Sequence, residues 1–476
     1  MINNILSTSK FEKIKNFIFI LLGFSVFFVS NNNGMFWDNV LFASKMGNHL
    51  FHNSVFNWTI PNEFDPGHPP FLGFLLALSW KALGHKLWVS HLLMLPFKIG
   101  VFYQLYKFIF HFVEDRKHQI LAFLLVIIDP TLSTQLVLVN PEVIIVFFFL
   151  LTLNGILFKN NNFKFIGLFF LSIVSFRSMM LFGGIFLYDI LNKLYIEKKT
   201  IKSIFNLKFL LFYFLGSLPG VTFVIWRLLT KGWLQTHPDS PWASLWKVAT
   251  PKIFFKNTIT LIHRYLDFGR IFMMLFLLVS LFVFGRKIIK STKNKQLLLL
   301  SITAVFFIII AVLFSTNAFG HRYFIVSFIC LNLLTLRVIK KYYTKKKLIY
   351  GLLFFGLISG NFWIYPKSIS QGWDATLAHV PYHSLRIKAI DYLKREQLDV
   401  SNVASFFPNL TTLDFIDFSG DKKSFTKFTG KNKYVLNSTV YNLSDEELNI
   451  LDKNYIILKE FKNLNITITI YILDKK

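Results

Sequence analysis

The stretch that decides the fold is FIFILLGFSVFFVS, residues 17–30. It carries no charge, and Lys10, Lys13 and Lys15 precede it. A secretory leader would end at a small-x-small cleavage site, but the chain continues as SNNNG over residues 30–34. We therefore expect an uncleaved first membrane span whose amino end lies in the cytoplasm.

Apolar runs of this kind recur along the chain. Hydrophobic residues make up 54% of the 476 and charged residues only 16%, which is not the composition of a soluble protein. Ten further runs can form membrane-spanning helices: 87–106, 119–135, 141–158, 163–177, 179–192, 207–229, 271–285, 297–315, 321–338 and 348–365. The sequence thus predicts a polytopic α-helical membrane protein with about 11 transmembrane helices.

The positive charge is distributed as membrane topology requires. The net charge of +27 could suggest nucleic-acid binding, but 37 of the 52 basic residues lie within residues 1–365, where every second loop is basic. These loops fall at 107–117, 159–164, 193–202, 286–295 and 337–347. Basic loops of multi-pass proteins face the cytoplasm. The pattern argues against a nucleic-acid partner and places residues 31–86 on the outer face of the cytoplasmic membrane.

The carboxyl-terminal part, residues 366–476, differs in character from residues 1–365. Its charges nearly balance, with 15 basic and 13 acidic residues. Residues 383–398 and 444–454 have the pattern of amphipathic helices, whereas 433–441 and 466–473 alternate as strands do. We expect a small α/β domain on the outer face. Cys330 is the only cysteine, so no intramolecular disulfide is possible.

Polar and acidic residues gather in the first outer loop. Asp38, Glu63, Asp65 and His68 all lie within residues 31–86, which is too long for a simple connector. The same topology places Glu142, Arg177, His321 and Arg322 at the outer ends of later spans. Carboxylates can deprotonate an acceptor hydroxyl while cations stabilise a leaving phosphate. We find no Walker or Rossmann glycine pattern, so a lipid-borne sugar phosphate fits better than a nucleotide sugar.

The sequence resembles the integral-membrane GT-C glycosyltransferases that use polyprenyl-phosphate sugars, the group related to protein mannosyltransferases and aminoarabinose transferases. The resemblance covers most of residues 15–340, and four short motifs carry it: Trp37-Asp38, His68-Pro69-Pro70-Phe71, Pro141-Glu142 and His321-Arg322-Tyr323. It implies that Asp38 is the general base, that Glu142 assists or positions the acceptor, and that His68 lies near the lipid phosphate.

The first loop departs from the family pattern. Many relatives have Asp-Glu or Asp-x-Asp there, whereas this chain has Asp38-Asn39. We expect neither an essential metal nor another cofactor, because Arg177, His321 and Arg322 could bind the donor phosphate. Acceptor or sugar contacts are assigned to the remaining polar and aromatic candidates: Glu63, Asp65, Trp233, His237, His263 and Arg264, with Trp242 and Trp246 in the same aromatic, basic segment.

Each candidate also has a structural interpretation. Asp38 and Glu142 could cap the helices that they begin, and Pro69-Pro70 could simply start a surface helix. Arg177 could reach lipid head groups, and the tryptophans could be interfacial anchors. Glu63 and Asp65 could be solvated turn residues. Asp129, inside an expected span, could be structural.

The expected activity is that of an inverting hexosyl or pentosyl transferase. The donor would be a polyprenyl-phosphate-linked sugar, and the acceptor a protein, lipid or glycan hydroxyl. The alternatives are a transporter or flippase of lipid-linked saccharides, and a polysaccharide polymerase or ligase that uses lipid-diphosphate-linked chains.

Overall fold

A computed structural model describes residues 2–241 and 247–474, with side chains from residue 12 onward. Within these residues, seven helical segments are long and apolar enough to cross a membrane. They are Glu12–Ser30 in α1, Leu87–Phe112 (α4), Phe176–Ile196 (α9 with η3), Leu207–Lys231 (α11), Arg270–Lys290 (α13), Thr292–Leu313 (α14 and α15) and His321–Tyr342 (η4 and α16). The chain is therefore a multi-pass helical membrane protein, as predicted, but the number of 11 spans is not confirmed.

The expected span 119–135 is broken in two. Its halves, α5 (Arg116–Ile127) and α6 (Pro130–Val137), meet at an angle of 71°. Pro130 cannot donate a backbone hydrogen bond within a continuous helix, and the Asp129 carboxylate instead accepts from the Thr131 N–H at 3.0 Å to cap α6. Arg270 Nε donates to the same carboxylate at 2.9 Å, so Asp129 has the structural role considered above.

The expected span 163–177 ends earlier than the apolar run suggests. Helix α8 stops at Val174, and Ser175 caps the next helix in a reciprocal pair with Ser178. Arg177 consequently lies in the first turn of α9 and not at the end of α8. Helices α7 (Pro141–Leu157), α8 (Asn161–Val174) and α17 (Lys346–Ser359) fill the remaining expected positions but are shorter than 18 residues.

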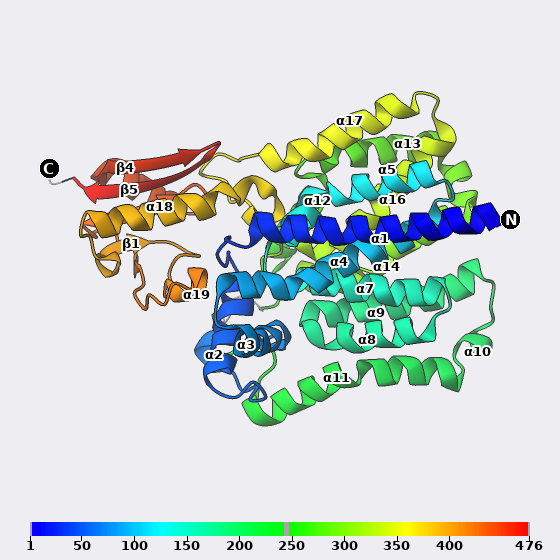
Figure 1. Cartoon of the computed structure of the whole chain (residues 1–476), viewed down its shortest axis with the longest axis horizontal. Helices are drawn as coiled ribbons and strands as arrows, with labels where there is room; N and C mark the ends of the chain where they lie inside the picture. The colour runs from blue at the N-terminus through cyan, green and yellow to red at the C-terminus, as the bar shows by residue number, and fades with distance from the viewer. Residues whose placement is uncertain (1, 242–246, 475–476) are drawn as a thin grey trace.

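The centre of the bundle is formed by α7 and α16. Both are apolar around most of their circumference, and most of their residues are buried. In contrast, α11 and α13 expose large apolar side chains such as Leu229 and Phe282, as lipid-facing helices do. In Figure 1 the helices run lengthwise, with the amino terminus and α10 (Ile201–Ile204) at one end.

The first loop folds at the other end of the bundle. It contains η1 (Val40–Lys45), α2 (Met46–His52), η2 (Asn62–Phe64) and α3 (Phe71–Leu83). A Cβ atom on Gly73 would lie 2.9 Å from the Gly47 nitrogen, so α2 and α3 pack closely only because both positions are glycine. The 230–240 segment follows α11 and covers this loop from one side, since the Ser240 hydroxyl donates to the Asp65 carbonyl at 2.7 Å.

The carboxyl-terminal part forms a mixed five-stranded sheet at this same end (Figure 1). The strands are β1 (Val403–Ser405), β2 (Thr426–Lys427), β3 (Tyr434–Ser438), β4 (Tyr455–Asn463) and β5 (Ile466–Leu473), in the order β2-β1-β3-β5-β4. Strand β1 runs parallel to β2 and β3, and the other pairs are antiparallel. Helices α18 (Pro381–Arg395) and α20 (Asp445–Asn454), with α19 (Asp414–Asp417), complete a small α/β unit, as predicted.

The segment after α17 joins the sheet unit to the bundle. It passes through η6 (Trp373–Ala375) and η7 (Leu377–His379). Gln135 of α6 donates to the Asp374 carbonyl at 2.6 Å, and the Thr131 hydroxyl donates to the Ala375 carbonyl at 3.3 Å. On the other side, the Phe36 ring stacks on His379 at 4.5 Å. Residues 36–38 and 373–375 are thereby held against the ends of the central helices.

Candidate active site

Arg322 gathers three carboxylates that are far apart in the sequence. It lies in η4 (His321–Phe324), and its side chain is 8% exposed. Its guanidinium forms ion pairs with Asp38 from the first loop, with Asp374 from η6, and with Glu142 at 3.3 Å from the first turn of α7. Because a guanidinium offers five donors in a plane, one arginine can satisfy all three acids.

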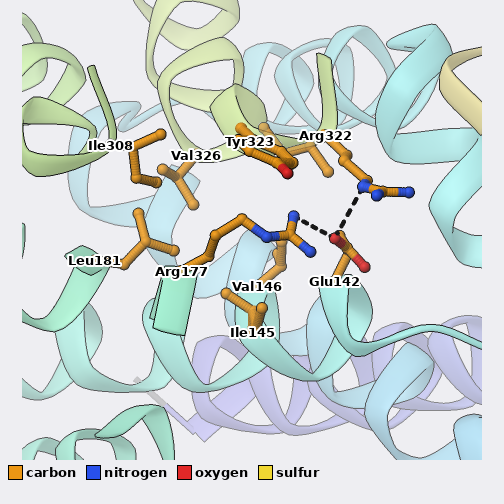
Figure 2. Close-up of a pocket in the computed structure, with 10 residues that line it drawn as sticks. Glu142, Ile145, Val146, Arg177, Leu181, Ile308, Arg322, Tyr323 and Val326 are labelled. Carbon is orange, nitrogen blue, oxygen red and sulfur yellow. Dashed lines mark ion pairs between the residues drawn. The ribbon is translucent and has the colours of Figure 1, made fainter. Parts of the chain in front are cut away.

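Arg177 reaches Glu142 from the opposite side. Figure 2 shows the two arginines approaching the Glu142 carboxylate from α9 and η4, with Tyr323 beside them. The Arg177 guanidinium carbon lies 4.3 Å from the centroid of the Tyr323 ring, which stabilises the cation further. The cavity between these groups measures about 20 Å³ and has room for about one water molecule, so a sugar must enter by displacing side chains.

The contacts of these residues differ from the capping and head-group contacts considered in the sequence. The Asn140 side chain, and not Glu142, accepts from the Val143 N–H at the start of α7. Asn39, and not Asp38, occupies the N-cap position of η1. Arg177 is buried and paired with Glu142 instead of extending towards head groups. Four of the sequence candidates therefore meet in one charged cluster.

Asp374 completes this cluster and was missed in the sequence. It sits in a connecting segment without helix or strand periodicity, so only its chain neighbours offered a signal: Trp373-Asp374 repeats the Trp37-Asp38 dipeptide. Burial raises the pKa of Asp374, and the negative charges of Asp38 and Glu142 add to this effect, while Arg322 opposes it. Of the acids around Arg322, Asp374 is thus well suited to hold a proton.

His68 lies beside the cluster as a neutral ring. Its Nδ1 accepts from the Phe176 N–H at 3.3 Å, next to Arg177 in the chain, and its ring packs on Phe42. Burial lowers the pKa of His68 to about 3, and the nearby charges of Arg177, Arg227 and Arg322 contribute. With Nδ1 accepting, Nε2 carries the hydrogen and can donate to an anion. The predicted phosphate contact would therefore be a neutral hydrogen bond.

Asp65 is not a solvated turn residue. Its carboxylate is buried, lies 3.0 Å from Arg227 and 3.5 Å from Lys231, and accepts from the Gly67 N–H at 2.9 Å. These contacts fasten the first loop to the end of α11. Glu63 is exposed on η2, in keeping with a solvated turn residue.

The aromatic and basic residues of the 230–270 segment take separate positions. The Trp233 ring lies 4.1 Å from the Arg227 guanidinium carbon and packs at a tilt against the His237 ring at 5.5 Å, next to the Asp65 pair. Arg264 donates to the Phe319 carbonyl at 3.3 Å. Trp242 and Trp246 lie outside the described residues.

His321 is turned away from the charged cluster and towards a second acid. Its Nε2 lies 2.9 Å from Asp267, which also accepts from the Tyr365 hydroxyl and lies 3.8 Å from His263. This group holds the residue that directly precedes Arg322. Asp267 and Tyr365 were not among the sequence candidates.

A search of residues 2–241 and 247–474 for three or more His, Cys, Asp or Glu side chains able to hold one metal ion finds none. In the cluster itself, an arginine occupies the position between the three carboxylates that a shared cation would need.

Comparison with known proteins identifies the fold. No family description and no curated protein sequence matches the chain. Among solved structures, it is similar to ArnT from Cupriavidus metallidurans bound to undecaprenyl phosphate, with a TM-score of 0.51 and 9% identity, over 95% of this chain and 97% of that one. The apo form of the same enzyme aligns over the same shares, with a TM-score of 0.47 and 8% identity. ArnT is a GT-C glycosyltransferase, so the predicted GT-C-like fold is confirmed.

Proposed function

We propose that this protein is a glycosyltransferase that moves a sugar from a polyprenyl-phosphate carrier to an acceptor hydroxyl at the outer face of the cytoplasmic membrane. The observation that carries the proposal is the Arg322 cluster, with Asp38, Glu142 and Asp374 on one guanidinium and Arg177 beside them. The whole-chain likeness to a structure that contains undecaprenyl phosphate supports the choice of carrier.

In this reaction Asp38 takes the proton of the acceptor hydroxyl as the hydroxyl oxygen bonds to the anomeric carbon. The bond from that carbon to the phosphate oxygen breaks, and the polyprenyl phosphate leaves with the electron pair. A single displacement of this kind inverts the anomeric centre. Arg177 and Arg322 stabilise the phosphate charge, and His68 donates a hydrogen bond to it.

The charge balance of the cluster links these steps. Three carboxylates face two arginines, so the cluster is one negative charge in excess when all the groups are ionised. An anionic carrier phosphate is repelled by such a site unless a carboxylate is neutralised. Asp374 is suited to be the neutralised carboxylate, because burial raises its pKa and so favours its protonated form. Protonation then frees Arg322 to face the phosphate.

Orientation follows from the alternating basic loops. The amino terminus and the 193–202 loop lie at the end of the bundle opposite to the cluster (Figure 1). If the basic loops face the cytoplasm, as they do in other multi-pass proteins, the cluster and the carboxyl-terminal sheet lie outside, which supports the proposed orientation.

The test uses membranes from a strain in which the gene is deleted, because these accumulate both donor and unmodified acceptor. Purified protein added to them is expected to release free polyprenyl phosphate and to add one glycosyl residue to an envelope component, both read by mass spectrometry. Asp38→Asn is expected to lower the rate about 10²- to 10⁴-fold. Glu197→Gln, which changes a carboxylate near the opposite end of the bundle, serves as the matched control.

An Asp38→Asn protein that is folded and fully active would exclude Asp38 as the base. Translocation of a lipid-linked saccharide in vesicles without any glycosyl transfer would favour the transporter. Transfer that consumes only diphosphate-linked donors would favour the polymerase or ligase.

A further inference from the structure

Two Trp-Asp dipeptides meet at Arg322. Asp38 and Asp374 both pair with its guanidinium, and each directly follows a tryptophan, Trp37 or Trp373. Each tryptophan is therefore joined by one peptide bond to a carboxylate-bearing residue of the cluster. Trp37 has a backbone φ of 51°, which bulky residues rarely adopt, so the surrounding contacts hold it in place.

Both indole N–H groups lack an acceptor. The Nε1 atoms of Trp37 and Trp373 are buried, and neither has a hydrogen-bond partner among the residues that the structure describes. Trp373 as a whole is only 3% exposed. Buried N–H groups in folded proteins nearly always bond to something, because leaving one unsatisfied is costly. Two unsatisfied donors beside the reacting carboxylates point to a polar ligand with acceptor oxygens.

Each tryptophan lines a cavity between the bundle and the sheet unit. The cavity at Trp37 measures about 260 Å³, and the Phe407 ring stands edge-on to the indole at 5.2 Å. The cavity at Trp373 measures about 140 Å³ and includes Tyr365 and Tyr471. Asn442 lines both cavities, so they are neighbours, and each cavity holds a tryptophan that directly precedes an aspartate of the Arg322 cluster.

The lining of the two cavities fits a carbohydrate chain. Aromatic faces alternate with neutral hydrogen-bonding groups, such as Asn437, Thr439 and Asn442 in the cavity at Trp373. A pyranose ring has an apolar face that packs on an aromatic ring and equatorial hydroxyls that exchange hydrogen bonds with amides, hydroxyls and indole N–H groups. Charged residues of both signs line the cavity at Trp37, Lys427 and Glu447 among them, so the lining does not favour a strongly anionic ligand.

We infer that the acceptor is a glycan chain that occupies both cavities, with Trp37 and Trp373 as platforms on either side of the cluster. The chain would present one hydroxyl to the carboxylates at Arg322, while the indole N–H groups bond to sugar oxygens. This inference rests on the proposed function, since it names the acceptor of the same site.

Photo-crosslinking in living cells tests the inference without knowledge of the glycan. A diazirine-bearing lysine analogue replaces Lys367 at the Trp373 cavity or Lys427 at the Trp37 cavity, both of which carry exposed lysines. The matched control replaces Lys388, an exposed lysine of α18 elsewhere on the sheet unit. After irradiation, the purified full-length protein is digested and the adducts are identified by mass spectrometry.

We expect adducts with the mass ladder of glycosyl residues at Lys367 and Lys427 and none at Lys388. Trp373→Phe in the Lys367 probe background keeps an aromatic ring but removes the indole N–H, and it is expected to lower the adduct yield about 3- to 10-fold. Unchanged thermal stability of this variant shows that the loss is not unfolding.

Peptide or phospholipid adducts, adducts of equal yield at Lys388, or no adduct at all would each overturn the inference. Because the crosslink requires no turnover, its result is independent of the transfer assay. Glycan adducts without transferase activity would defeat the proposed function alone, and transferase activity with peptide adducts would defeat the glycan acceptor alone.

Discussion

Replacing Arg322 with glutamine probes the central feature of the site. The substitution removes the ion pairs to Asp38, Glu142 and Asp374, and leaves Arg177 in contact with Glu142 alone. Breaking a buried ion pair costs about 3–5 kcal/mol, because the remaining charge is left without compensation. Scaling the entropy of unfolding with chain length makes 1 kcal/mol worth about 1 °C in a protein of this size. We expect the melting temperature at pH 7.5 to fall by about 3–5 °C.

The same variant has a defined pH dependence. The pKa of Asp374 is already above its ordinary value through burial, and Arg322 is the first group that opposes the rise. Without Arg322, the folded state holds a proton on Asp374 that the unfolded state releases above its ordinary pKa, so stability falls as the pH rises. One such proton changes the free energy of unfolding by about 1.4 kcal/mol per pH unit. The difference in free energy of unfolding between the wild type and Arg322→Gln should therefore be about 2–3 kcal/mol smaller at pH 5.5 than at pH 7.5.

Thermal unfolding of the purified protein in detergent, followed by tryptophan fluorescence between pH 5.5 and 7.5, measures both effects. Arg395→Gln is the control, since Arg395 is an exposed residue at the end of α18, away from the cluster. An Arg322→Gln protein as stable as the wild type, or one whose deficit is the same at every pH, would refute the reasoning.

Three further outcomes can be measured. Asp65→Asn leaves Arg227 buried without its counter-ion, so it should destabilise the protein by about 3–5 kcal/mol and make the 230–240 segment more susceptible to proteolysis. The control in that segment is Asp239→Asn, which should change the free energy of unfolding by less than about 0.5 kcal/mol. His68 has a pKa of about 3 in the folded state, so the wild-type protein loses stability as the pH falls below 6.5, where the unfolded state takes up a proton on His68. Between pH 7 and 5, the free energy of unfolding of His68→Gln should therefore fall by about 2 kcal/mol less than that of the wild type. An equal fall in the two proteins, measured by thermal unfolding, would show that His68 is already charged in the folded state. Asp374→Asn should shift the acidic limb of the pH–rate profile for carrier release, and a profile identical in shape to that of the wild type would exclude Asp374 as the group that takes up a proton.

The helical bundle could be predicted because its signals are local. Apolar runs and the basic residues between them report membrane insertion segment by segment, without knowledge of what packs against what. The structure departs from the expected boundaries where one residue changes the backbone: Pro130 breaks the expected span 119–135, and the Ser175 cap moves Arg177 into the next helix. The hairpin strand β4 was also not expected, since most of its residues are exposed and lack an apolar face.

The site was predicted only in part, because its chemistry depends on long-range packing. Asp38, Glu142, Arg177 and Arg322 could be singled out as polar residues at the ends of apolar runs. Their convergence on one guanidinium could not, and Asp374 comes from a segment whose position is set by hydrogen bonds to Gln135 and Thr131. The residues around Asp65 are typical of an exposed turn, and so nothing in the sequence indicated that its carboxylate forms a buried ion pair with Arg227.

The Arg322 cluster has a consequence for the biogenesis of the protein. Asp38 and Arg322 are 284 positions apart, and Asp374 follows Arg322 by 52. Residues emerge from the ribosome in this order, so Asp38 and Glu142 have no ion pair with Arg322 until that residue and the helix that follows it, α16, have been synthesised and inserted. A chain that stops before residue 322 lacks Arg322 and cannot form the cluster, and a chain that stops before residue 374 forms it without Asp374. A chain truncated at either point therefore cannot form the complete cluster on which the proposed transfer depends.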